Sequence, residues 1–310
     1  MLKKRAIRKI FITTFVLFIL LTIYLIPEKN NNNADIEYHY SSMKDVDIYL
    51  MNDNNQLTKV EMKIKDNSIE ELVASIINKL TISNDSTIPK GLKQIIPKNI
   101  KLRDLYIDEG IIYLNFSEEL LTLKKEKLDK IIEGISYSLL NLKGITGISF
   151  YVEEKNINEI YSKFYPNIIT KDYGINRRTE LKGLNNLSKV VIFYIDDINE
   201  NKYYVPITKY INDEREKIKI IIDELSSNYI YESNLITLLD KNIELIDYQI
   251  NNDLMILNFN NSIFLNEKNI IEEVVYTISY SVFENYNDIE TIIFQVNNEE
   301  IIKKFKKDIE

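Results

Sequence analysis

The sequence predicts an α+β protein, with an N-terminal transmembrane helix followed by two tandem ββαββαβ domains. Each domain is expected to be a mainly antiparallel sheet covered on one face by two helices. An internal repeat is the first observation behind this fold class. Leu-Asn-Phe at 114–116 recurs at 257–259, and Ser-Tyr-Ser at 136–138 recurs at 279–281. A repeat of domain size indicates a duplicated globular domain, and strand and helix patterns follow in the same order in both halves.

The N-terminus predicts a membrane anchor. Residues 1–9 hold five basic side chains, and the apolar run at 10–26 would span about 25 Å as a helix, near the lower limit for a bilayer core. The positive-inside rule makes 1–9 a cytoplasmic tail and places both domains outside the cell membrane, in a single-pass arrangement. A cleaved signal peptide is the alternative, but no small-x-small site follows the run. Residues 27–45 are expected to be a polar linker.

In the first repeat, alternation of apolar and polar residues at 46–50 and 60–64 predicts two strands, separated by a turn of Asn and Asp. Apolar residues then recur along 69–80 at the spacing of an amphipathic helix. Ser68 is the expected N-cap of this helix, with a glutamate three residues later to complete a capping box.

A hairpin and a second helix follow. Strands at 102–107 and 111–116 flank a turn in which Gly110 is free to take a positive φ. A second apolar stripe over 128–142 predicts the second helix, and residues 148–152 predict the last strand.

The second repeat follows the same scheme, which sets the domain limits. The first domain is expected at 46–153 and the second at 189–300. Residues 154–188 are polar and are expected to be a connector, with some local helix. Residues 301–310 are expected to be a short, charged C-terminal helix.

Composition excludes several classes of function. Formal net charge is −8, and removing the basic N-terminus leaves −13 for the rest, so binding to nucleic acid is not expected. The absence of cysteine excludes disulfides, zinc–thiolate sites, thiol nucleophiles and a lipidated cysteine. The single histidine, His39, cannot build a triad or a multi-histidine metal site.

The residues of the first repeat resemble the GerM domain family of sporulation and germination proteins. The resemblance is carried by Gly91-Leu92, Ile96-Pro97, the strand pair around Gly110, and Leu114-Asn115-Phe116-Ser117. In the second repeat, Val205-Pro206-Ile207-Thr208 resembles the early strand of the family. Asn115 and Asn258 stand where the family usually has Asp. The family resemblance implies a ring-building type of domain that works by protein–protein contact outside a membrane.

Two carboxylate pairs could suggest chemistry. Glu118-Glu119 could form an acid–base dyad, and Asp196-Asp197 could contribute to a metal site. However, the second repeat replaces the first pair with Asn and Ser, and a loop of Asp and Asn between strands is usually a turn. We therefore predict solvated charge at Glu118-Glu119 and a turn at Asp196-Asp197, and assign no catalytic, cofactor-binding or metal site.

The repeated Ser-Tyr-Ser triplets are interpreted as a shared packing or hydrogen-bonding need of the second helix. A nucleophilic serine would require an adjacent base, and a histidine is not available in either domain. The chain also has 21 tyrosines, which are used either as strand residues or at a protein or glycan interface.

The leading hypothesis is a non-catalytic scaffold of sporulation that needs no cofactor. The family resemblance implies that it supports or localises a transenvelope channel complex between mother cell and forespore, with other envelope sporulation proteins or copies of itself as partners. The contact surface is expected on the outer face of the sheet, including Lys59 and Lys63. A cell-wall glycan-binding module or hydrolase accessory, with peptidoglycan as its ligand, is the alternative.

Overall fold

The protein forms two compact units, Met1–Ser41 and Ser42–Glu310, in a computed structural model. The structure describes residues 4–25, 43–65, 68–161, 164–180, 187–227, 234–266 and 269–308. His39 and most of the predicted linker lie outside these ranges. The linker was expected to reach residue 45, but the first strand already begins at Met43.

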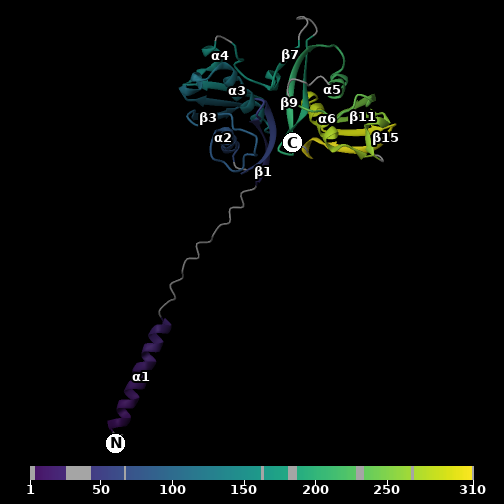
Figure 1. Cartoon of the computed structure of the whole chain (residues 1–310). Helices are drawn as coiled ribbons and strands as arrows, with labels where there is room; N and C mark the ends of the chain where they lie inside the picture. Colours follow the sequence, from purple (N-terminus) through teal and green to yellow (C-terminus); the bar gives the residue numbers. More distant parts are fainter. Residues whose placement is uncertain are drawn as a thin grey trace. The chain divides into compact units, whose positions relative to one another are not determined.

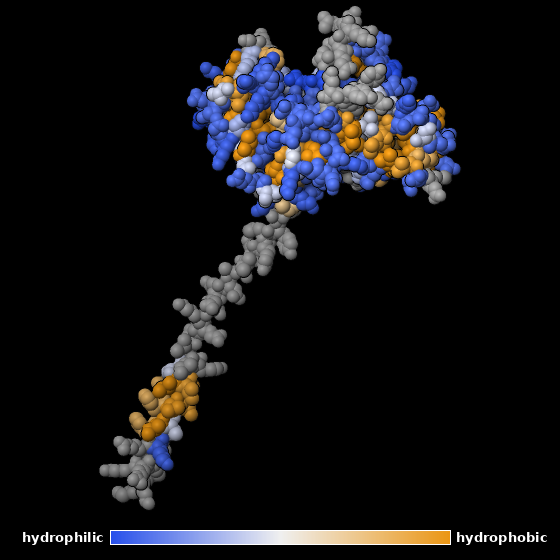
Figure 2. All heavy atoms as spheres, in the orientation of Figure 1, coloured by the Kyte–Doolittle hydropathy of each residue, from blue (hydrophilic) through white to orange (hydrophobic). Residues whose placement is uncertain are grey.

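In the first unit, the structure describes the helix α1 (Lys4–Leu25). The apolar side chains of residues 11–21 are exposed, as Figure 2 shows, and they include Phe11, Leu17 and Phe18. Within the part of the chain that the structure describes, no helix is long and apolar enough to cross a bilayer. The structure therefore does not confirm the predicted transmembrane helix.

The second unit holds both repeats, which share one order of elements (Figure 1). The expected N-cap of α2 is confirmed, because the Ser68 hydroxyl accepts a hydrogen bond from the Glu71 amide at 3.3 Å. The first repeat consists of β1 (Met43–Met51), β2 (Leu57–Lys65), α2 (Ile69–Leu80), β3 (Leu102–Asp108), β4 (Ile111–Phe116), α3 (Lys125–Leu139), β5 (Gly147–Val152) and β6 (Lys155–Asn156). The second has the matching elements β8 (Leu187–Ile198), β9 (Asn201–Asn212), α5 (Lys217–Ser226), β10 (Leu245–Asn251), β11 (Leu254–Phe259), α6 (Glu272–Asn285), β14 (Thr291–Val296) and β15 (Glu299–Phe305). It adds a small hairpin between β11 and α6, made of β12 (Phe264–Asn266) and β13 (Asn269–Ile270).

Each repeat has its own four-stranded sheet, in the order β3-β4-β5-β6 or β10-β11-β14-β15. The two outer pairs of each sheet are antiparallel, as predicted, but the central pairs β4–β5 and β11–β14 are parallel. A parallel pair needs a crossover connection, and the second helix of each repeat supplies it. The fold is therefore α+β with sheets that are antiparallel for the most part.

The first hairpins of the two repeats do not join those sheets. They form one shared five-stranded sheet, in which β2 pairs with β9 through Lys59 and Tyr204, and β8 pairs with β9. The prediction of one sheet per domain is thus wrong. α3 packs against β1 and α6 packs against β8, so each second helix lies between a four-stranded sheet and the shared sheet (Figure 1). That position explains why Glu133 to Leu139 of α3 are buried all round the helix.

Two further segments differ from the expectation. The connector contains the expected local helix, α4 (Ile157–Ile160), but it also adds a strand, β7 (Arg178–Glu180), which runs parallel to β9 in the shared sheet. The C-terminal segment is a strand, β15, followed by a short 3-10 turn, rather than a charged helix. Asn297 and Asn298 cause this, since both take a positive φ and form the two-residue turn of a hairpin with β14.

Candidate functional site

The junction between the repeats is organised by Asn176, a connector residue that is 5% exposed. Its side-chain amide donates to the carbonyl of Leu57 in β2 at 2.8 Å and to the carbonyl of Pro206 in β9 at 2.9 Å. Its side-chain oxygen accepts from the Leu57 amide at 2.9 Å. One asparagine therefore satisfies backbone groups of both repeats beside the β2–β9 pairing.

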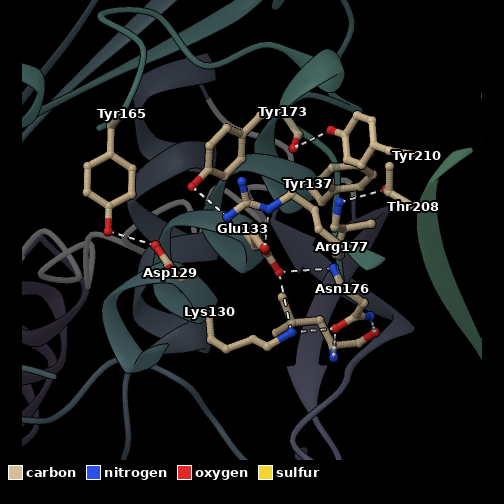
Figure 3. Close-up of polar contacts among 12 residues, drawn as sticks. Asp129, Lys130, Glu133, Tyr137, Tyr165, Tyr173, Asn176, Arg177, Thr208 and Tyr210 are labelled. Atoms are coloured by element: carbon tan, nitrogen blue, oxygen red, sulfur yellow. Dashed lines mark hydrogen bonds and ion pairs between the residues drawn. The ribbon is translucent and has the colours of Figure 1, made fainter. Parts of the chain in front are cut away.

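A buried carboxylate holds this connector in place. Glu133 of α3 is 3% exposed. Its carboxylate accepts hydrogen bonds from the backbone N–H of Asn176 at 3.0 Å and from Arg177 Nε at 2.9 Å. Lys130 Nζ lies 3.4 Å from the same carboxylate and donates to the Asn176 side-chain oxygen at 2.8 Å (Figure 3). The carboxylate has two cations and an amide as partners, which compensates for its burial. Its hydrogen-bonding capacity is used within the fold, which favours a structural role.

The last serine of each repeated triplet makes the same contact. Ser138 accepts from the Tyr49 amide of β1 at 3.0 Å, and Ser281 accepts from the Phe193 amide of β8 at 2.9 Å. Each hydroxyl also donates to a carbonyl one turn earlier in its own helix. These serines satisfy strand amides that face away from the hairpin partner. The predicted hydrogen-bonding need of the triplets is confirmed for these two serines.

The tyrosine of each triplet lies at the junction. Tyr137 is 1% exposed and donates to the Lys171 carbonyl of the connector at 3.4 Å. Tyr280 lies in a cluster with Tyr204 at 5.0 Å between ring centroids, and Lys59 Nζ of the first repeat lies 4.1 Å from its ring centre. Sequence reasoning placed Lys59 on an exposed contact surface, and this is wrong, because the second repeat covers it.

The two carboxylate pairs do not come together. Glu118 and Glu119 begin a 3-10 turn after β4, and the Glu118 amide donates to the Glu153 carboxylate at 3.2 Å. Asp196 and Asp197 lie at the end of β8, so the turn predicted there is wrong, and the chain turns at Asn199 and Glu200 instead. Among the residues whose placement is described, no three His, Cys, Asp or Glu side chains gather as a metal site would require.

Asp196 differs from its neighbour because it is buried and accepts a hydrogen bond from Asn52 at 2.6 Å. Burial raises its pKa above the ordinary value for Asp. A raised pKa means that this group favours folding most below the unfolded pKa and disfavours it as pH rises through the folded pKa. We therefore expect the stability of Asp196→Asn, relative to that of wild type, to increase from pH 3 to pH 7. Urea unfolding of both proteins at the two pH values measures this difference.

The matched controls for this prediction are adjacent. Asp197→Asn removes a negative charge from an exposed neighbour in the same strand, and so controls for the general effect of losing one charge there. Asn52→Ala removes the donor from a buried carboxylate and is expected to cost about 1–3 kcal/mol at pH 7. Equal pH profiles for Asp196→Asn and wild type would contradict the prediction.

Comparison with known proteins decides the family. The model of the family "Germane: Sporulation and spore germination" matches residues 47–158 and 191–302, once in each repeat. This chain belongs to the Germane family. The resemblance to GerM domains that the sequence indicated is thereby confirmed.

Two relatives place this Germane-family chain more closely. It is 26% identical over 221 residues to "Spore germination protein GerM" of Bacillus subtilis (strain 168). That alignment covers 68% of this chain and spans 60% of the relative. The solved structure "Tandem GerMN domains of the sporulation protein GerM from Bacillus subtilis" is similar, with a TM-score of 0.75 at 22% identity, over 83% of this chain and 92% of that one. The tandem fold is therefore shared.

Sequence reasoning missed the residues that join the two Germane domains. Asn176 and Arg177 lie in the segment interpreted as a connector, and Glu133 lies inside a helix stripe. A weak signal was available for Glu133, since the apolar residues around it leave little polar surface on the helix. Asn176 takes a φ of 48°, in the left-handed region that asparagine tolerates.

Proposed function

We propose that this protein is a non-catalytic scaffold of sporulation. It supports or localises a transenvelope channel complex between mother cell and forespore, through ring-building-type protein–protein contacts. The observation that carries the proposal is the shared sheet, because it joins two Germane domains into one compact unit. A scaffold needs fixed spacing between its contact surfaces, and the Asn176 network favours one arrangement of the two domains.

A location outside the cell membrane is part of this proposal. It is supported by the five basic residues before the apolar run at 10–26 and by the exposed apolar side chains of α1. External protease added to intact protoplasts should digest a tag at the C-terminus and leave a cytoplasmic marker protein intact. Protection of the tag until the cells are lysed would exclude this topology.

The proposed role is tested by following a fluorescent copy through growth and sporulation in the native host. Enrichment at the septum and at the engulfing membrane is expected, together with recovery of envelope sporulation proteins after cross-linking. A uniform membrane signal throughout growth would overturn the sporulation role. Co-sedimentation with purified peptidoglycan would then favour the glycan-binding alternative.

A further inference from the structure

The outer face of the first four-stranded sheet carries three tyrosines side by side. Tyr106 of β3 pairs with Tyr113 of β4, and their rings stack with centroids 4.4 Å apart. Tyr151 of β5 lies beside them, with its centroid 6.3 Å from that of Tyr113. Tyr106 is 52% exposed, so the row opens to solvent.

These rings line a groove of about 550 Å³ that also contains charged groups. Asp104, Glu153 and Glu154 contribute carboxylates, and Arg103 contributes a guanidinium. Arg103 is paired with Glu153 at 2.7 Å. Within the described chain, Asp104 and Glu154 form no ion pair with it or with another cation. The groove therefore combines aromatic rings with a net negative charge.

The second repeat shows that the fold does not require this surface. Gln249 and Ile256 pair in the register of Tyr106 and Tyr113, and Gln295 takes the register of Tyr151. The same sheet thus forms without the three rings. The tyrosines are consequently available for a role other than folding.

The turn after β5 also differs between the repeats in residues that the fold does not require. Glu153 and Glu154 have φ values of 46° and 68°, and the corresponding turn of the second repeat has Asn297 and Asn298 at 51° and 69°. Asparagine adopts the left-handed region more readily than glutamate does. The first repeat therefore has two glutamates beside the groove although their backbone conformation is less favourable for glutamate than for asparagine.

We propose that this groove binds a lysine- or arginine-bearing segment of a partner protein. A cation is attracted by the faces of aromatic rings and by carboxylates, and the groove offers both. Anionic ligands are repelled by the carboxylates.

This inference deepens the proposed scaffold function by naming one contact surface and the chemistry of its partner. It rests on that function only for the partner being an envelope protein. Binding in the groove is therefore tested with purified protein, independently of localisation. If the purified protein does not bind the cationic probe but septal enrichment is normal, the groove proposal alone is overturned. If the protein binds the probe but is not enriched at the septum, the scaffold role alone is overturned.

The probe is a fluorescent peptide of alternating lysine and glycine, titrated with the full chain and followed by anisotropy. The variant Tyr106→Gln/Tyr113→Ile/Tyr151→Gln transfers the residues of the second repeat and keeps the net charge. We expect it to weaken binding about tenfold or more while leaving the unfolding temperature close to that of wild type. If the triple variant folds poorly, Tyr106→Gln alone, at the most exposed ring, replaces it in the test and should give a smaller loss of binding.

A matched pair separates the groove from general attraction to an acidic protein. Asp104→Asn and Asp247→Asn make the same change at corresponding positions of the two repeats. Only Asp104→Asn should weaken binding, by about threefold to tenfold. Equal effects of the two variants, or unchanged binding by the triple tyrosine variant, would overturn the proposal. Tyrosine-dependent binding of a neutral chito-oligosaccharide that ignores Asp104→Asn would overturn it in favour of a glycan.

Discussion

Asn176→Ala is expected to lower the free energy of unfolding by about 3–5 kcal/mol, because it leaves buried backbone groups without hydrogen-bond partners. The Leu57 amide and the carbonyls of Leu57 and Pro206 lose their partner at once. Lys130 loses one of its acceptors as well. Total stabilities of about 5–15 kcal/mol are typical, so this loss is a large fraction. Urea unfolding measures it, and hydrogen exchange at Leu57 should accelerate.

The backbone of Asn176 needs its own control, since alanine tolerates a positive φ less well than asparagine. Asn252 has a φ of 56° and lies exposed in the turn between β10 and β11. Asn252→Ala should therefore cost only the backbone preference, about 1 kcal/mol. Asn176→Gly relieves the backbone and still loses the hydrogen bonds. If both Asn176 variants cost no more than Asn252→Ala, the amide does not join the repeats.

The elements of each repeat could be predicted from the sequence because their signals are local. The helix stripes and the alternating strands reflect burial against the repeat's own core, and Ser68 marks a helix start by its own hydrogen bond. The turn at Asn297 and Asn298 could also have been predicted from its local sequence. Two asparagines between apolar stretches favour a hairpin, and that signal indicates a strand at the C-terminus.

The shared sheet depends on contacts between residues far apart in the chain, which periodicity does not encode. One signal did point to it. Residues 190–195 form a continuous apolar run, which is typical of a strand buried on both faces, and β8 is buried throughout that run. In β1, by contrast, Asp47 is buried although its alternation with apolar residues predicts a polar outer face. Its burial follows from the presence of the second repeat.

Lys59→Glu is expected to destabilise the protein by about 3–5 kcal/mol or more, because it breaks a buried ion pair and replaces it with two carboxylates. Lys59 Nζ lies 2.8 Å from the Asp47 carboxylate, and the two side chains are only 9% and 5% exposed. The substitution also removes the cation above the Tyr280 ring. Urea unfolding at pH 7 should show the loss.

Lys63→Glu is a control that the chain itself supplies. Lys63 lies on the same face of the same strand and also pairs with an aspartate of β1, Asp45, at 4.0 Å. Its side chain is 72% exposed, and exposed pairs contribute about 1 kcal/mol or less. The sequence gives the two lysines the same environment, whereas the structure places only Lys59 under the second repeat. Similar losses for both variants would contradict that burial, and a large loss for Lys59→Glu alone requires that the two repeats stay packed together in solution.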